Sequence, residues 1–173
     1  MSKDSNPDAG LKDYLSAAVL LILVVLISIK GTQILRTVTG SELPLAVVEG
    51  RSMRPLLRDG DLVVVVKEDP SEIKVGDIIV YKTMDGRYII HRVIGVEIFD
   101  GKYYYRTKGD NWVTNPIEDC RFYDRVQGAA EDFGCGVGRI GVGYDRVVGV
   151  VMEIDGSSLK IPYLGYISLL LHG

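Results

Sequence analysis

The chain has 173 residues and a formal net charge of −3, with 47% hydrophobic and 25% charged residues. This length suits one domain with an appendage. The nearly balanced charge argues against a protein that binds nucleic acid through its phosphates. Only 2 His and 2 Cys occur, which excludes most zinc sites built from these residues. A catalytic imidazole must come from His91 or His172, and His172 is the penultimate residue, a poor position for a rigid site.

The hydrophobic residues concentrate at residues 14–29, a stretch of 16 residues without a charge. As a helix it spans about 24 Å, and the flank through Leu35 extends it toward the ~30 Å of a bilayer core. A cleaved signal sequence and a buried core helix are the alternatives. The preceding residues are poorly basic, however, and the stretch has no polar face. We predict a membrane anchor at residues 14–35 behind a disordered tail at residues 1–13.

From residue 42 onward the pattern changes to that of β-structure. Segments rich in Val, Ile and Tyr are separated by Gly, Asp and Pro, and Asp-Gly pairs are typical of hairpin turns. Short strands at this spacing predict a mainly β, barrel-like domain over residues 42–171. The expected strands are residues 45–48, 61–67, 77–82, 88–98, 102–107 and 146–154.

Two further segments lack a clear period. Residues 122–144 are rich in Gly and are expected to form a long loop or insertion. They contain a G-x-G-x-x-G match that follows no strand, so no nucleotide or other cofactor is expected. Residues 159–171 are apolar but too short to span a bilayer, and we favour contact with the membrane surface over a core strand. Cys120 and Cys135 could pair outside the cytoplasm or remain free thiols.

Three polar motifs lie in or just after predicted strands. Ser52 follows the first strand, where a lone Ser is usually a turn residue. His91 interrupts an apolar strand, and alternation along that strand places it on the face opposite Arg92. Asp110 belongs to a Gly-Asp-Asn turn, and Asp119 follows nine residues later. Each motif alone has an ordinary structural explanation.

Together, four motifs in order behind an anchor resemble the type I signal peptidases of the archaeal and endoplasmic-reticulum subtype. The resemblance covers residues 14–119 and 145–171. It implies an anchored β-domain of the signal-peptidase type, and a serine endopeptidase that removes signal peptides from secreted and membrane precursors after small residues. The motifs are Gly-x-Ser-Met-x-Pro at 50–55, Gly-Asp-Ile-Ile at 76–79, His-Arg-Val at 91–93 and Lys-Gly-Asp-Asn at 108–111.

The resemblance also implies roles for single residues. Ser52 would be the nucleophile, and His91 stands where the bacterial subtype uses Lys. Asp110 would give acidic support, together with a second Asp six residues later. Position 116 is Pro, so that second Asp is matched only by allowing about three extra residues, at Asp119. Both acids therefore stay open as the partner of the His.

The family further implies a cytoplasmic tail and a catalytic domain outside the cytoplasm or in a lumen. The expected partners are precursor proteins that carry signal peptides and the lipid bilayer of the cell or endoplasmic-reticulum membrane. No nucleic acid, metal or cofactor is expected. The sequence does not determine whether other subunits are needed.

Two other functions compete. A self-cleaving repressor-type peptidase has a related β-fold with a Ser/Lys pair. It needs a Lys on the strand where His91 lies and usually carries a DNA-binding region in place of an anchor. A membrane-tethered β-domain that only binds a protein partner predicts that Ser52 and His91 lie far apart, because a nucleophile and its base must approach each other closely.

Overall fold

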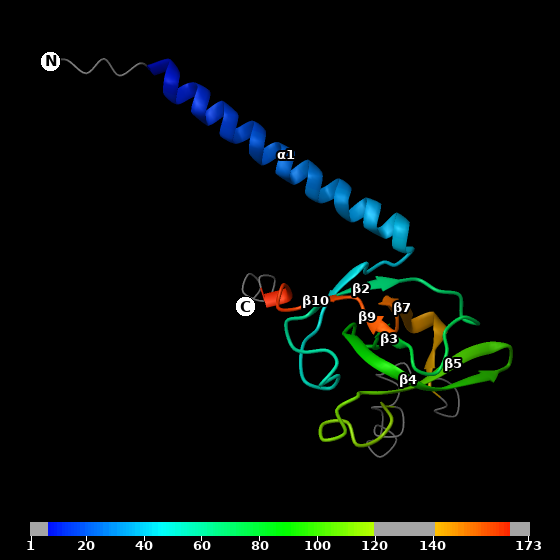
Figure 1. The fold of residues 1–173 in the computed structure, drawn as a ribbon. Helices are drawn as coiled ribbons and strands as arrows, with labels where there is room; N and C mark the ends of the chain where they lie inside the picture. The colour runs from blue at the N-terminus through cyan, green and yellow to red at the C-terminus, as the bar shows by residue number, and fades with distance from the viewer. Residues whose placement is uncertain (1–6, 120–140, 167–173) are drawn as a thin grey trace. The chain divides into compact units, whose positions relative to one another are not determined.

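The computed structural model describes residues 7–119 and 141–166. The chain divides into a helical unit, residues 1–38, and a β unit that begins at Thr39. The elements are α1 (Pro7–Thr39), β1 (Leu45–Val47), β2 (Leu62–Val66), β3 (Ile78–Lys82), β4 (Tyr88–Phe99), β5 (Lys102–Lys108), β6 (Val142–Gly143), the 3-10 helix η2 (Tyr144–Arg146), β7 (Val147–Val151), β8 (Glu153–Ile154), β9 (Ser157–Ser158) and β10 (Lys160–Ile161) (Figure 1).

Helix α1 is longer at both ends than the predicted anchor at residues 14–35. The predicted disordered tail is wrong over residues 7–13, which are helical from Pro7, a residue whose fixed φ and missing N–H suit a first helical turn. The helix then continues to Thr39. It ends at Gly40, whose φ of +63° is the left-handed conformation that commonly follows a helix.

The part of α1 from Tyr14 to Thr39 is apolar and 26 residues long. At about 1.5 Å per residue it measures about 39 Å, enough to cross a hydrocarbon core of about 30 Å. Within residues 7–119 and 141–166, it is the one helix with the length and composition to span a membrane. None of its apolar window is buried, which does not fit the alternative of a buried core helix.

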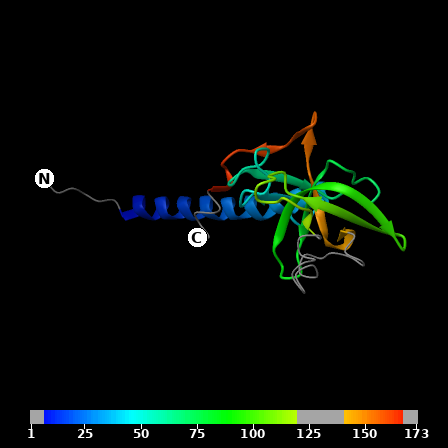
Figure 2. The ribbon, with the colours of Figure 1, turned by 90° about the horizontal axis from the view of Figure 1, so that it is seen from below.

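The β unit is built from an eight-stranded antiparallel sheet, and the mainly β class is confirmed. Its strands follow the order β1-β2-β7-β3-β4-β5-β6, and β10 pairs with β2 beside this path. Strands β4 and β5 form the long hairpin that is green in Figures 1 and 2. The barrel-like closure is not seen among the described strands, because β1 and β6 end the path without pairing with each other.

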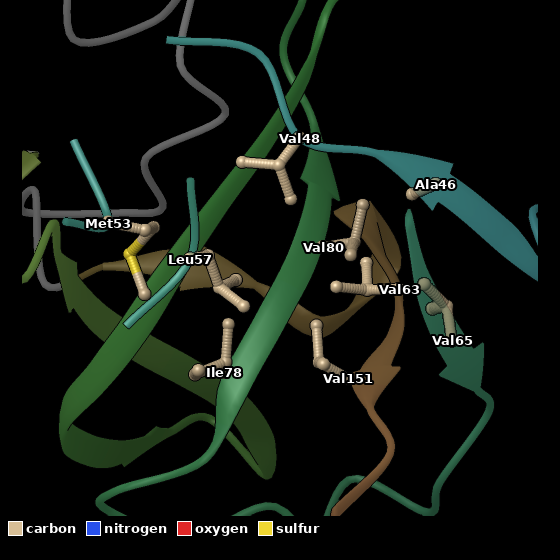
Figure 3. Close-up of a cluster of buried hydrophobic side chains, with 9 residues drawn as sticks. All are labelled: Ala46, Val48, Met53, Leu57, Val63, Val65, Ile78, Val80 and Val151. Carbon is tan, nitrogen blue, oxygen red and sulfur yellow. The ribbon is translucent and has the colours of Figure 1, made fainter. Parts of the chain in front are cut away.

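Strand β3 is buried on both of its faces, so it separates two apolar clusters. Ile78 and Val80 point into one cluster and Ile79 and Tyr81 into the other, as the two-residue period of a strand requires. The first cluster also holds Met53 and packs beneath the residues that follow β1 (Figure 3). The second contains Val93 on β4.

Other segments differ from their predicted limits. The predicted strand at residues 146–154 is divided into the end of η2, β7 and β8. The last residues of the Gly-rich segment form β6, which pairs with β5. In the C-terminal segment, β10 is a sheet strand paired with β2. Cys120, Cys135 and His172 lie outside the described residues, as do residues 122–140 and 167–171.

Candidate active site

The register of the sheet determines where His91 points. His91 lies opposite Ile79 in the β3–β4 ladder, so the two side chains share a face. That face belongs to the cluster that contains Val93, two residues further along β4. His91 is only 6% exposed, whereas Arg92 points to the other face. The alternation predicted from sequence is therefore confirmed.

The imidazole of His91 contacts one of the two acids singled out in the sequence. Its Nδ1 lies 2.7 Å from Oδ2 of Asp119, and both side chains are buried. The same Oδ2 accepts hydrogen bonds from the Tyr81 hydroxyl at 3.0 Å and from Thr107 Oγ1 at 2.6 Å. With Nδ1 as the donor to the carboxylate, Nε2 of the ring is the acceptor.

Asp110 occupies a different environment. Its two carboxylate oxygens accept hydrogen bonds from Nε and Nη2 of Arg92, at 2.8 and 2.7 Å. Arg92 also donates from Nη1 to the carbonyl oxygen of Gly76 at 2.6 Å. The hydrogen bond to Asp110 is the main cause that raises the pKa of Arg92. The structure thus places Asp119, and not Asp110, at the imidazole of His91.

Ser52 lies in the turn that follows β1. The turn begins at Gly50, which adopts a φ of +92° and donates its N–H to Oδ1 of Asp59 at 2.8 Å. Behind Ser52, the side chains of Met53 and Leu57 are buried in the cluster of Figure 3. They attach the turn to the sheet through apolar contacts.

The Lys-Gly-Asp-Asn turn holds the Ser52 turn from the other side. The backbone N–H of Asn111 donates to the carbonyl oxygen of Ser52 at 2.7 Å. The Asn111 side chain donates from Nδ2 to the carbonyl oxygen of Arg51 at 2.9 Å. A Cβ at Gly109 would lie 2.7 Å from the Ser52 carbonyl oxygen, so this close approach requires glycine. Two motifs 55 or more residues apart are therefore fastened together.

A groove of about 470 Å³ connects these parts. It is lined by residues 45–49 of β1 and its continuation, by Ser52 and Met53, and by residues 87–91 that lead into β4. Ser52 and His91 line the same groove, so a hydroxyl and an imidazole face one space. This arrangement suits attack on a carbonyl by a hydroxyl with an adjacent base. Among residues 7–119 and 141–166, no cluster of three or more His, Cys, Asp or Glu side chains could hold a metal ion.

Sequence reasoning missed three residues that the structure brings to this site. Tyr81 and Thr107 reach Asp119 from strands on either side of β4, and Asn111 holds the Ser52 turn. Asn111 lies in a motif that the sequence did single out, which is a usable signal. No sequence pattern distinguishes Tyr81 from the other tyrosines, since its role depends on the register of β3 against β4.

Comparisons with known proteins agree with this site. A family model described as Peptidase S24-like matches residues 25–110, which include Ser52 and His91. The SEC11 catalytic subunit of the signal peptidase complex from Yarrowia lipolytica is 34% identical over 79% of this chain and 68% of its own length. The sec11 subunit from Dictyostelium discoideum is 35% identical over 70% of each chain. The human SEC11C subunit is 39% identical over 72% of this chain and 64% of its own.

The chain belongs to the family of signal peptidase catalytic subunits. The matched regions span about two thirds of each relative. Relative to this family, the chain carries its Ser and His in one groove and a buried Asp on the His.

Proposed function

We propose that this chain is a membrane-anchored signal peptidase, a serine endopeptidase that uses Ser52 as nucleophile, His91 as general base and Asp119 as the acid that orients His91. The 2.7 Å contact between Nδ1 of His91 and Asp119, beside a groove that Ser52 also lines, carries this proposal. The catalytic-subunit relatives support signal-peptide cleavage as the reaction. Asp110 acts through Arg92 as a structural acid.

The chemistry follows from the positions of the two ring nitrogens. Nε2 of His91 takes the proton from Ser52 as Oγ attacks the scissile carbonyl carbon. Asp119 holds Nδ1–H and stabilises the imidazolium that forms. The imidazolium then protonates the leaving amine, the C–N bond breaks, and water hydrolyses the resulting ester by the reverse proton path. The backbone N–H of Ser52 is the proposed donor to the oxyanion.

The substrate would bind as an added strand along β1. The N–H of Val48 bonds to Asp61, and the carbonyl of Pro44 accepts from Val65. Because backbone groups alternate between the two sides of a strand, those of Leu45 and Val47 point away from β2. These groups lie on the groove, which leads along β1 to Ser52. A groove with apolar walls beside the nucleophile suits small side chains before the cut.

The membrane helix would confine enzyme and precursor to one bilayer and so raise their effective concentration. The proposed topology places residues 1–13 in the cytoplasm and the β unit outside it or in a lumen. The named relatives are catalytic subunits of a complex, so we propose that this chain also works beside partner subunits. Its bilayer would be the cell membrane or the endoplasmic-reticulum membrane.

The test is cleavage of a signal-peptide precursor by the full chain in membranes. Ser52→Ala and His91→Ala should each abolish cleavage while the β-domain stays folded, because each removes a reacting group. Ser157→Ala and His172→Ala are the matched controls and should cleave normally; Ser157 is an exposed serine in β9. Full cleavage by either Ser52→Ala or His91→Ala would instead favour a tethered β-domain that only binds a partner.

A further inference from the structure

Three hydrogen bonds meet at one oxygen atom of Asp119. Oδ2 lies 2.7 Å from Nδ1 of His91, 3.0 Å from the Tyr81 hydroxyl and 2.6 Å from Thr107 Oγ1. All four residues are buried, with exposed fractions of 0% for Tyr81, 1% for Thr107 and 4% for Asp119. Water therefore cannot readily replace any of the three donors.

The sheet register explains why these donors converge. Tyr81 on β3 is two residues beyond Ile79, the direct partner of His91, and so lies on the same face. On the other side of β4, Thr107 of β5 is the direct partner of Val93, which again shares the face of His91. Three neighbouring strands thus each present one hydrogen-bond donor to the same side of the sheet.

Resting on the proposed function, we propose that Tyr81 and Thr107 are positioning residues that hold the Asp119 carboxylate in the orientation that receives Nδ1–H of His91. A carboxylate held by His91 alone could turn about its side-chain bonds, and the imidazole could then adopt the other tautomer. The two hydroxyls lie on opposite sides of β4 and donate to the same oxygen, so they remove this freedom. Neither hydroxyl takes part in the proton transfer.

Another tyrosine of the same cluster provides a matched control. Tyr105 is also fully buried, but its hydroxyl donates to the carbonyl oxygen of Pro70 at 2.7 Å. Tyr81→Phe and Tyr105→Phe therefore each remove one buried hydroxyl and one hydrogen bond from the same core. They differ in whether the lost bond ends on Asp119.

The experiment measures kcat and KM for a precursor peptide with the full chain in detergent or bilayer. We expect Tyr81→Phe and Thr107→Val each to lower kcat about tenfold, the effect of one hydrogen bond to a charged group, with KM unchanged. Thr107→Ser keeps the hydroxyl and should restore most of the kcat. Tyr105→Phe should lower thermal stability to a similar extent as Tyr81→Phe but leave kcat within twofold of the original chain.

Equal kcat values for Tyr81→Phe and Tyr105→Phe, or no difference between Thr107→Val and Thr107→Ser, would overturn the inference. Ser52→Ala, measured in the same series, separates this failure from failure of the proposed function. If Ser52→Ala is inactive while Tyr81→Phe behaves like Tyr105→Phe, only the positioning role is wrong. If Ser52→Ala cleaves normally, the proposed function itself is wrong.

Discussion

Asp110 and Asp119 lie nine residues apart, yet their carboxylates have opposite surroundings. Asp110 forms a two-pronged pair with the guanidinium of Arg92, which is partly exposed. Asp119 is buried and binds the imidazole of His91. Since His91 and Arg92 are consecutive on β4 and point to opposite faces, each takes its own acid. The comparison teaches that strand alternation, rather than closeness to a motif, decides which acid serves the histidine.

The largest expected effect separates the two acids. Asp119→Asn should lower kcat by roughly 10⁴, the loss seen for the corresponding change in other Ser-His-Asp enzymes, because an amide favours the wrong tautomer of the imidazole. Asp110→Asn should stay within about tenfold of the original kcat, since its carboxylate contacts Arg92. The measurement is precursor cleavage by both variants in the same membranes. A loss of 10³ or more in Asp110→Asn would break the contrast.

The sequence predicted much of this arrangement and missed part of it for physical reasons. Ser52 and His91 could be placed because each lies in a motif, and alternation correctly separated His91 from Arg92. The choice between the acids depends on how residues 112–118 fold back over the sheet, which no local pattern specifies. The length of α1 was underestimated because composition marks an apolar stretch and not the helical turns that flank it.

The second prediction concerns the stability contributed by the Asp110–Arg92 pair. Asp110→Asn should lower the free energy of unfolding by about 1–3 kcal/mol, the range for a hydrogen bond that involves a charged group, because Arg92 loses its counter-ion. Urea denaturation of the full chain, followed by circular dichroism, measures this change. An unchanged midpoint would show that the ion pair is not the structural partner that we describe.

The third prediction concerns the contact between the two motif turns. Asn111→Ala removes the hydrogen bond from Nδ2 to Arg51, which helps to hold the Ser52 turn, but keeps the backbone bond to Ser52. We expect kcat to fall about fivefold to tenfold, as for a hydrogen bond of about 1 kcal/mol, with little change in KM. Asn115→Ala, in the same loop, is the control. Equal kcat values for the two variants would contradict a positioning role for Asn111.

The smallest expected effect tests substrate pairing with β1. Leu45→Pro removes a backbone N–H on the side of the strand that faces away from β2, and it should raise KM about fivefold with kcat nearly unchanged. Leu45→Ala keeps this N–H and is the matched control. Steady-state kinetics with a precursor peptide distinguishes the two. If both variants raise KM equally, the side chain and not strand pairing accounts for the loss.

The account depends most on Asp119 holding His91 with its proton on Nδ1. The ¹⁵N chemical shifts of the imidazole nitrogens in the full chain report the tautomer directly, and His172→Gln leaves His91 as the only signal, since the chain has 2 His. We predict the Nδ1–H tautomer for this chain and for Asp110→Asn, and its loss in Asp119→Asn. The same tautomer in Asp119→Asn, or its loss in Asp110→Asn, would contradict the account.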